Sequence, residues 1–257
     1  MSELSVRALS KAFGGVAAVD QVSFDLKRGE FLAMIGPNGA GKTTCFNVIN
    51  GQLASNSGEI WFEEKNLAGL KPREIWRLGV ARTFQVAATF GSMTVAENVQ
   101  MALISHARET FGWWRPAASR YHARALELLE QVGIRATADR PCRELAYGDV
   151  KRLEFAVALA SEPRLLLMDE PTAGMAPRER TELIALVKRL VVERGISVLF
   201  TEHSMDVVFA FADRIVVLAR GRLIADGDAA SVRANETVQQ VYFGTGRAFE
   251  RRREPAP

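Results

Sequence analysis

The segment spanning residues 36–43 has the glycines, lysine and threonine of a loop that binds phosphate. It fits the pattern G-x-x-x-x-G-K-[ST] without a mismatch. Glycines let backbone N–H groups approach phosphate oxygens closely, and the N-terminus of a following helix favours the anion. Lys42 supplies a compact positive charge for the β- and γ-phosphates, and the Thr43 hydroxyl is placed to ligate magnesium. The predicted nucleotide-binding residues are Gly36, Pro37, Asn38, Gly39, Ala40, Gly41, Lys42, Thr43 and the adjacent Thr44.

A second chemical signal is the carboxylate pair Asp169 and Glu170, which follows the apolar run at residues 165–168. Ligands sit at the carboxyl ends of strands in parallel α/β sheets. Asp169 can hold magnesium, directly or through water, and Glu170 can polarise an attacking water as a general base. The alternative is that both carboxylates only cap a loop, because an apolar run followed by two acids is a weak signal alone. With a phosphate loop upstream, the pair predicts nucleotide hydrolysis.

The elements next to the phosphate loop are those that such a loop requires. Residues 31–35 form a continuous apolar run that ends directly before the loop, which predicts a strand buried on both faces. A helix is predicted at residues 42–50, with Gly51 as its stop. A glycine-rich turn that binds nothing is the alternative, but the order of strand, loop and helix favours phosphate binding.

The later part of the chain predicts an α/β fold. Strands are predicted at residues 165–168, 197–201 and 215–219, and a helix at residues 177–194 separates the first two. Strand, helix and strand in this order imply a parallel sheet. Residues 220–221 are predicted to form a hairpin turn.

The earlier part of the chain combines strands with a helical insertion. Strands are predicted at residues 4–9, 22–26 and 59–62. Residues 90–149 are predicted to form a mainly helical subdomain inserted in the chain, because residues 95–104 and 120–132 carry helical spacing. An irregular stretch between these helices contains Trp113 and Trp114. These two side chains either rest near a membrane surface or pack within the helical insertion.

Composition and charge agree with an ordinary globular protein. The 257 residues are 48% apolar and 25% charged, with a net charge of +3 that does not argue for nucleic acid. The two cysteines, Cys45 and Cys142, form no disulfide framework and are expected to be buried in a reducing compartment. No signal peptide or membrane span is expected, so a membrane role would require a partner. Residues 245–257, including the three arginines at 251–253, are expected to form a flexible basic tail.

The ordered motifs resemble the nucleotide-binding subunits of ATP-binding-cassette (ABC) transporters, over about residues 4–244. The resemblance implies an α/β fold: a P-loop ATPase core with a mainly parallel sheet, an N-terminal antiparallel β subdomain and an inserted helical subdomain. It implies ATP and Mg²⁺ as ligands, and Lys42, Glu170, His203 and Gln85 as catalytic residues. Metal ligation is implied for Thr43, Gln85 and Asp169.

The same resemblance assigns further residues to the nucleotide. Phe13 matches an aromatic residue that stacks on adenine, and His203, after the strand at residues 197–201, matches a histidine that contacts the γ-phosphate. The signature segment, residues 145–149, implies that Ala146, Tyr147 and Gly148 bind the γ-phosphate held by the other subunit of a dimer. It departs from the commonest form, Leu-Ser-Gly-Gly-Gln, since Ala146 lacks the serine hydroxyl and Tyr147 replaces a glycine. The dimer-contact loop, residues 173–177, lacks the usual aspartate, which Ala176 replaces.

Three segments resemble the ATPase subunits of branched-chain amino-acid importers: residues 82–85, residues 145–148 and the ending at residues 238–244. Such a subunit pairs with a like or second ATPase and with two permeases, and indirectly with a solute-binding protein that chooses the cargo. It is peripheral, on the cytoplasmic side of the inner (plasma) membrane. A groove lined by residues 86–90 is expected to receive a short permease helix. The alternatives are an exporter ATPase of the lipopolysaccharide type and a soluble nucleic-acid-associated ATPase, although no basic stripe favours nucleic acid.

Overall fold

The larger of two β-sheets carries the segments in which the candidate motifs lie. The computed structural model describes residues 2–83, 89–107 and 121–243. The sheet has the strand order β10-β9-β3-β8-β7-β6. Its strands are β3 (Phe31–Ile35), β6 (Val80–Thr83), β7 (Leu165–Asp169), β8 (Ser197–Thr201), β9 (Arg214–Ala219) and β10 (Arg222–Gly227). All neighbours pair in parallel except β9 and β10, which form an antiparallel hairpin. The predicted parallel sheet and the turn at residues 220–221 are therefore confirmed.

The side chains of the apolar runs that predicted these strands are divided between two hydrophobic clusters. Along β3, Phe31 and Ile35 face one buried cluster, which includes residues of α5 and α6, while Leu32 and Met34 face a second cluster between the two sheets. Because alternate side chains point to opposite faces of a strand, a strand covered on both faces must be apolar throughout. The same division holds along β7.

The smaller sheet is antiparallel, as the family resemblance implied. Its order is β2-β1-β4-β5. Its strands are β1 (Ser2–Phe13), β2 (Val16–Lys27), β4 (Ser57–Phe62) and β5 (Lys65–Asn66). The first two are longer than predicted. Along β1, register shifts between Leu9 and Lys11 and between Lys11 and Ala12 interrupt the apolar–polar alternation beyond the predicted range.

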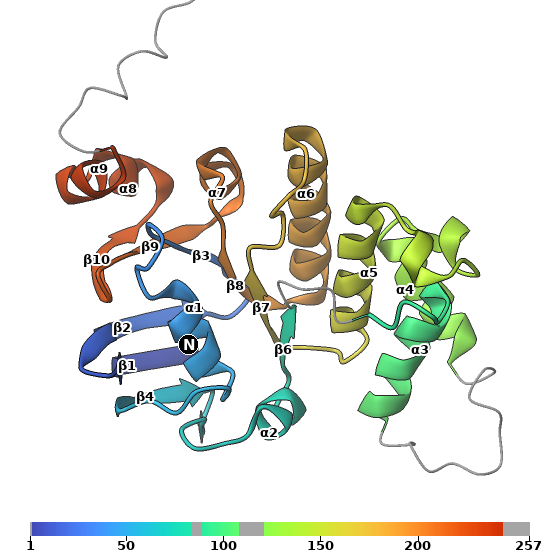
Figure 1. Cartoon of the computed structure of the whole chain (residues 1–257), viewed down its shortest axis with the longest axis horizontal. Coiled ribbons are helices and arrows are strands. Elements are labelled where there is room, and N and C mark those ends of the chain that lie inside the picture. The colour runs from blue at the N-terminus through green and yellow to red at the C-terminus, as the bar shows by residue number, and fades with distance from the viewer. Residues whose placement is uncertain (1, 84–88, 108–120, 244–257) are drawn as a thin grey trace, which may run out of the picture.

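Helices cover the larger sheet and extend beyond one end of it (Figure 1). They are α1 (Lys42–Ile49), α2 (Pro72–Arg77), α3 (Val95–His106), α4 (His122–Gln131), α5 (Tyr147–Leu159), α6 (Pro177–Arg194), α7 (Met205–Phe211), α8 (Ala229–Ala234) and α9 (Glu236–Phe243). In Figure 1, α3, α4 and α5 gather at the end away from the smaller sheet, and α8 and α9 lie near β9 and β10. A capping box, in which Thr94 and Glu97 satisfy each other's backbone N–H groups, starts α3.

The predicted helices at residues 42–50, 95–104, 120–132 and 177–194 correspond to α1, α3, α4 and α6. Cys45 and Cys142 are buried free thiols, as expected. In the described residues, no helix is long and apolar enough to cross a membrane. The expectations for Gln85, Trp113, Trp114 and the tail at residues 245–257 lie outside the described residues.

The central packing of the larger sheet generates a stability prediction. Phe200 of β8 is fully buried, and its ring centroid lies 4.6 Å from that of Phe31 on the neighbouring strand. Phe200→Ala is expected to lower the free energy of unfolding by about 3–5 kcal/mol, because it leaves a cavity in a close-packed core. Urea unfolding followed by circular dichroism measures this change.

The matched control is Val192→Ala, which removes methyl groups from a side chain 60% exposed on α6. It should change the unfolding free energy by less than about 0.5 kcal/mol. Equal losses in the two variants would contradict the assignment of Phe200 to the core.

Candidate functional site

The carboxyl ends of four adjacent strands define one edge of the larger sheet. In the order β3-β8-β7-β6, the strand before the phosphate loop neighbours the strand before His203, which neighbours the strand that ends at Asp169. These strands are parallel, so their last residues meet at the same edge. Segments more than a hundred residues apart in sequence are thereby brought together.

The phosphate loop has a backbone that only glycine fits at two positions. Gly36 has a φ of 158°, and a Cβ atom there would collide with the carbonyl oxygen of Leu218 on β9. Gly41 has a φ of 103°, and a Cβ there would collide with the carbonyl oxygen of Ala18 on β2. In addition, the Gly221 N–H in the β9–β10 turn donates to the Ala40 carbonyl at 3.1 Å. The loop is therefore shaped by strands on both sides of it.

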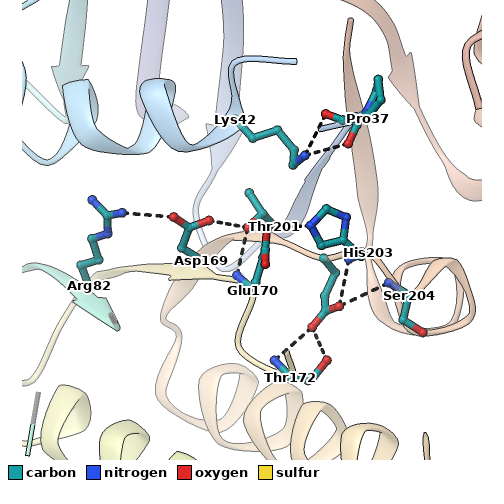
Figure 2. Close-up of polar contacts among 11 residues, drawn as sticks. Pro37, Lys42, Arg82, Asp169, Glu170, Thr172, Thr201, His203 and Ser204 are labelled. Carbon is teal, nitrogen blue, oxygen red and sulfur yellow. Dashed lines mark hydrogen bonds and ion pairs between the residues drawn. The ribbon is translucent and has the colours of Figure 1, made fainter. Parts of the chain in front are cut away.

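Lys42 starts α1 and lies over the loop. Its Nζ donates to the carbonyl oxygens of Gly36 at 2.7 Å and Pro37 at 3.2 Å (Figure 2). Burial lowers the pKa of the Lys42 ammonium, and the negative charges of Glu170 and Asp169 oppose this effect. Among the residues that the structure describes, no side chain caps the N-terminus of α1 at Gly41. The first backbone N–H groups of the helix thus remain available to an anion.

Asp169 is a buried carboxylate held from two neighbouring strands. Its Oδ1 accepts a hydrogen bond from the Thr201 hydroxyl at 2.7 Å, and its Oδ2 accepts one from the Arg82 guanidinium at 3.2 Å (Figure 2). Arg82 also donates to the side-chain oxygens of Asn47 at 2.7 Å and Gln52 at 3.1 Å. Because Asn47 belongs to α1, the arginine ties the helix after the phosphate loop to the acidic end of β7.

Glu170 and His203 face each other at the same edge. The Glu170 Oε1 and His203 Nε2 atoms are 2.6 Å apart, and the histidine side chain is 50% exposed whereas that of Glu170 is 19% exposed. Glu170 has a φ of 50°, which is unusual for a residue with a side chain. Its N–H donates to the Thr201 hydroxyl at 3.0 Å, so β8 stabilises this backbone conformation. A carboxylate beside an exposed imidazole, close to a phosphate loop, can handle the proton of a reacting water.

The remaining predicted residues are distributed over two regions. Phe13 lies at the end of β1 with 48% of its surface exposed, and the Lys11 ammonium lies 5.3 Å from the centroid of its ring. Ala146, Tyr147 and Gly148 lie at the start of α5, where the Tyr147 hydroxyl contacts Ala173 rather than the phosphate loop. Gln85 lies outside the described residues.

Sequence reasoning gave no role to four residues that the site uses. Arg82, Thr201, Thr172 and Glu202 are all at least partly buried and all bond to other site residues. The signal that could have found Thr201 and Glu202 is the change from apolar to polar residues at the end of the run at residues 197–201. Nothing in the sequence paired Arg82 with Asp169, since their strands are distant along the chain.

A cavity of about 630 Å³ lies beside this edge. It is bounded by α2, α3, α5 and the end of β6, and its lining includes Trp76, Ala102, Val157 and Arg82. Of the residues predicted to line a groove, Thr89 lines this cavity and Phe90 does not, whereas residues 86–88 lie outside the described residues. The cavity has apolar walls with charged residues beside them, which suits a protein segment of mixed character.

Comparison with known proteins identifies the class to which this fold and site belong. Residues 19–173 match the sequence model of the ABC transporter family. The chain is a member of the ABC transporter ATP-binding proteins. Residues 222–248 match a second model, described as branched-chain amino acid ATP-binding cassette transporter.

Two relatives illustrate the more particular likeness. The chain is 39% identical over 249 residues to the high-affinity branched-chain amino acid transport ATP-binding protein LivG of Salmonella typhimurium, covering 94% of this chain and 97% of the relative. It is 39% identical over 248 residues, with the same coverage, to the corresponding protein BraF of Pseudomonas aeruginosa. The chain is therefore similar to the LivG and BraF type of ATP-binding protein.

Two solved structures show the same fold. One is the ADP conformation of an ATP-binding cassette of an ABC transporter, with a TM-score of 0.85 and 32% identity, covering 95% of this chain and 99% of that one. The other is a dimeric post-hydrolysis state of an ATP-binding cassette bound to ADP and phosphate. It has a TM-score of 0.75 and 26% identity and covers 88% of this chain and 98% of that one. The predicted α/β ABC ATPase fold is thus confirmed.

The ion pair between Arg82 and Asp169 generates a second stability prediction. Their side chains are only 8% and 3% exposed. Arg82→Met is expected to lower the free energy of unfolding by about 3–5 kcal/mol, because it leaves a buried carboxylate without its cation. Urea unfolding of the nucleotide-free protein measures the change.

The control is Arg7→Met, which breaks an ion pair with Asp25 whose side chains are 50% and 38% exposed. This variant should lose less than about 1 kcal/mol, because water and salt screen the pair. A loss of that small size in Arg82→Met would show that the buried pair does not stabilise the site.

Proposed function

We propose that the chain is the ATP-hydrolysing subunit of an importer for branched-chain amino acids or related small polar solutes. The observation that carries the proposal is the contact between Glu170 and His203 beside the phosphate loop, in a chain that belongs to the ABC ATPases. The match of residues 222–248 and the two relatives named above support the solute class.

ATP binds along the edge of the larger sheet in this proposal. The exposed ring of Phe13 stacks on adenine, and the backbone N–H groups of residues 36–43 hold the phosphates. The side chain of Lys42 exchanges its bonds to the Gly36 and Pro37 carbonyls for contacts with the β- and γ-phosphates. The loop needs no large rearrangement, since glycines and neighbouring strands already set its shape.

The residues at this edge fit Mg²⁺. The donors available are the Thr43 hydroxyl, the Asp169 carboxylate and, from outside the described residues, Gln85. Oxygen donors of this kind suit the ion, and each Asp169 oxygen accepts only one of the hydrogen bonds described above, which leaves lone pairs for a metal or its water. When bound, the ion supplies positive charge that neutralises the phosphates.

Hydrolysis follows from the positions of Glu170 and His203. A water between Glu170 and the γ-phosphate loses its proton to the carboxylate as its oxygen attacks phosphorus, and the bond to the leaving ADP oxygen breaks. His203 contacts the γ-phosphate and orients Glu170 through their 2.6 Å contact. Lys42 stabilises the charge that develops on the transferred group.

A dimer completes the site. The signature segment, residues 145–149, meets the γ-phosphate of ATP held by the other ATPase subunit, which is either a second copy or a different chain. Ala146 offers no hydroxyl, so Gly148 and the uncapped N-terminus of α5 make this contact. A dimeric cassette of the same fold, bound to ADP and phosphate, supports this arrangement. ATP-driven closure of the dimer and its reopening after hydrolysis then move the permeases.

Two permease subunits couple to this movement through the 630 Å³ cavity. A short helix from a permease fits between α2, α3 and α5, a position that adjoins both Arg82 and the helical subdomain inserted at about residues 90–149. The chain would then be peripheral on the cytoplasmic side of the inner (plasma) membrane. A solute-binding protein selects the cargo and acts on the chain only indirectly.

The first prediction from this function concerns the general base. Glu170→Gln is expected to bind ATP with wild-type affinity but to hydrolyse it about 10²–10⁴-fold more slowly, because an amide cannot accept the proton of water. Nucleotide binding by fluorescence and phosphate release by a coupled assay measure the two effects. Glu182→Gln, on the exposed face of α6, is the matched control and should turn over normally. Normal turnover in Glu170→Gln would contradict the assignment of Glu170 as the general base.

The second prediction concerns the transported solute. The full chain, purified from its own membranes, is expected to bring with it two amino-acid permeases and a second ATPase subunit. The associated solute-binding protein should bind branched-chain amino acids or similar small solutes in a calorimetric screen. Recovery of a lipid-handling permease would favour an exporter instead. A salt-sensitive affinity for nucleic acid would favour the nucleic-acid-associated alternative.

A further inference from the structure

Tyr147 fastens the start of α5 to the loop that follows Glu170. Its hydroxyl donates to the Ala173 carbonyl at 2.8 Å. The ring covers Gly174, where a Cβ atom would lie 3.5 Å from it and where φ is +80°. The Lys151 ammonium lies 5.6 Å from the ring centroid on the same helix. Although half of its surface is exposed, Tyr147 therefore has a defined place against the loop at residues 171–176.

The same loop is fastened to the hydrolysis site by a buried carboxylate. Glu202 is 4% exposed, and its Oε1 accepts hydrogen bonds from the backbone N–H of Thr172 at 3.1 Å and from the Thr172 hydroxyl. Its Oε2 accepts a bond from the backbone N–H of His203 at 3.0 Å. The carboxylate therefore bonds both to Thr172 and to the backbone of His203, two residues that Figure 2 labels. A buried charge of this kind holds its partners firmly, because losing any of them is costly.

The two sets of contacts join through one peptide unit, since Thr172 and Ala173 are adjacent. We propose that Tyr147 is a positioning residue that couples the hydrolysis site of its own chain, through this loop, to its signature segment. The inference rests on the proposed function, in which that segment meets the nucleotide of the other subunit. The commonest signature has glycine at this place, which provides no hydroxyl for the loop. The tyrosine thus supplies a link that the commoner form lacks.

The geometry defines what the link does. In the proposed dimer, the N-terminus of α5 meets the other subunit's phosphate, and within the chain the loop at residues 171–176 follows directly after Glu170. A shift of His203 or Glu170 as phosphate is formed reaches Thr172 through Glu202, and reaches α5 through the Tyr147 hydroxyl. The two half-sites of one chain then change together. Loss of the hydroxyl uncouples them without altering the phosphate loop.

The test compares catalysis with binding in the assembled transporter. Tyr147→Phe keeps the ring against Gly174 and removes only the bond to Ala173. It is expected to lower kcat about threefold to tenfold, the effect of one hydrogen bond, while the affinity for ATP stays within about twofold of wild type. Thr137→Val is the matched control, because it removes a hydroxyl bond to the Ile134 carbonyl (2.7 Å) in the short helical turn that follows α4. It should leave both quantities unchanged.

A double-variant cycle tests the route of the coupling. Thr172→Val removes the hydroxyl bond to Glu202, whereas Thr172→Ser keeps it and should restore wild-type turnover. Combining Thr172→Val with Tyr147→Phe should reduce kcat no further than the more affected single variant, because both interrupt the same path. Independent, multiplying losses in the double variant would overturn the proposal, as would a wild-type kcat in Tyr147→Phe.

A measurement without turnover separates this inference from the proposed function. Amide hydrogen exchange of residues 173–176 in the nucleotide-free full chain should be about threefold or more faster in Tyr147→Phe than in wild type or Thr137→Val. An unchanged exchange rate would show that the Tyr147 hydroxyl does not hold the loop, even in a chain that hydrolyses ATP. If Tyr147→Phe exchanges faster but the wild-type chain binds no ATP, the contact exists and the proposed function is rejected. The coupling, which rests on that function, is then rejected as well.

Discussion

The buried carboxylate of Asp169 is the interaction on which the organisation of the site depends. An ionised group with 4% exposure must be paired and hydrogen-bonded, and its two partners come from the strands on either side of β7. Thr201 ends the strand that leads to His203. Arg82 connects the carboxylate to the helix after the phosphate loop through Asn47, and to the turn after that helix through Gln52. The phosphate-binding and hydrolytic halves of the site are thus held in one register by a single side chain.

The strand order β3-β8-β7-β6 makes this possible. Parallel strands place their carboxyl ends together, so Lys42, Asp169, Glu170 and His203 lie at the same edge although they are distributed over 162 residues of sequence. The helix α5 starts at the signature segment, packs against the sheet and connects the sheet to α3 and α4. One helix therefore belongs both to the ATPase core and to the surface that faces partners.

Much of this organisation could be predicted from residues alone. The apolar runs at residues 31–35 and 165–168 identified buried strands because both of their faces are covered, and the polar residues after them identified the site. The longer extent of β1 could not be predicted, because the register shifts after Leu9 break its alternation. The role of Arg82 depends on β6 and β7 being neighbours in the sheet. The role of Glu202 depends on the loop at residues 171–176, which places Thr172 against it. Both are properties of three-dimensional packing rather than of local pattern.

The bracing of the phosphate loop by β9 and the β9–β10 turn has a consequence for biosynthesis. The loop lies near the start of the chain, yet its strand lies between β8 and β9, and Gly221 holds the carbonyl of Ala40. A nascent chain on the ribosome has made the phosphate loop long before it has made either neighbouring strand. The contacts that shape the loop in the folded protein are therefore completed only after most of the chain has been made.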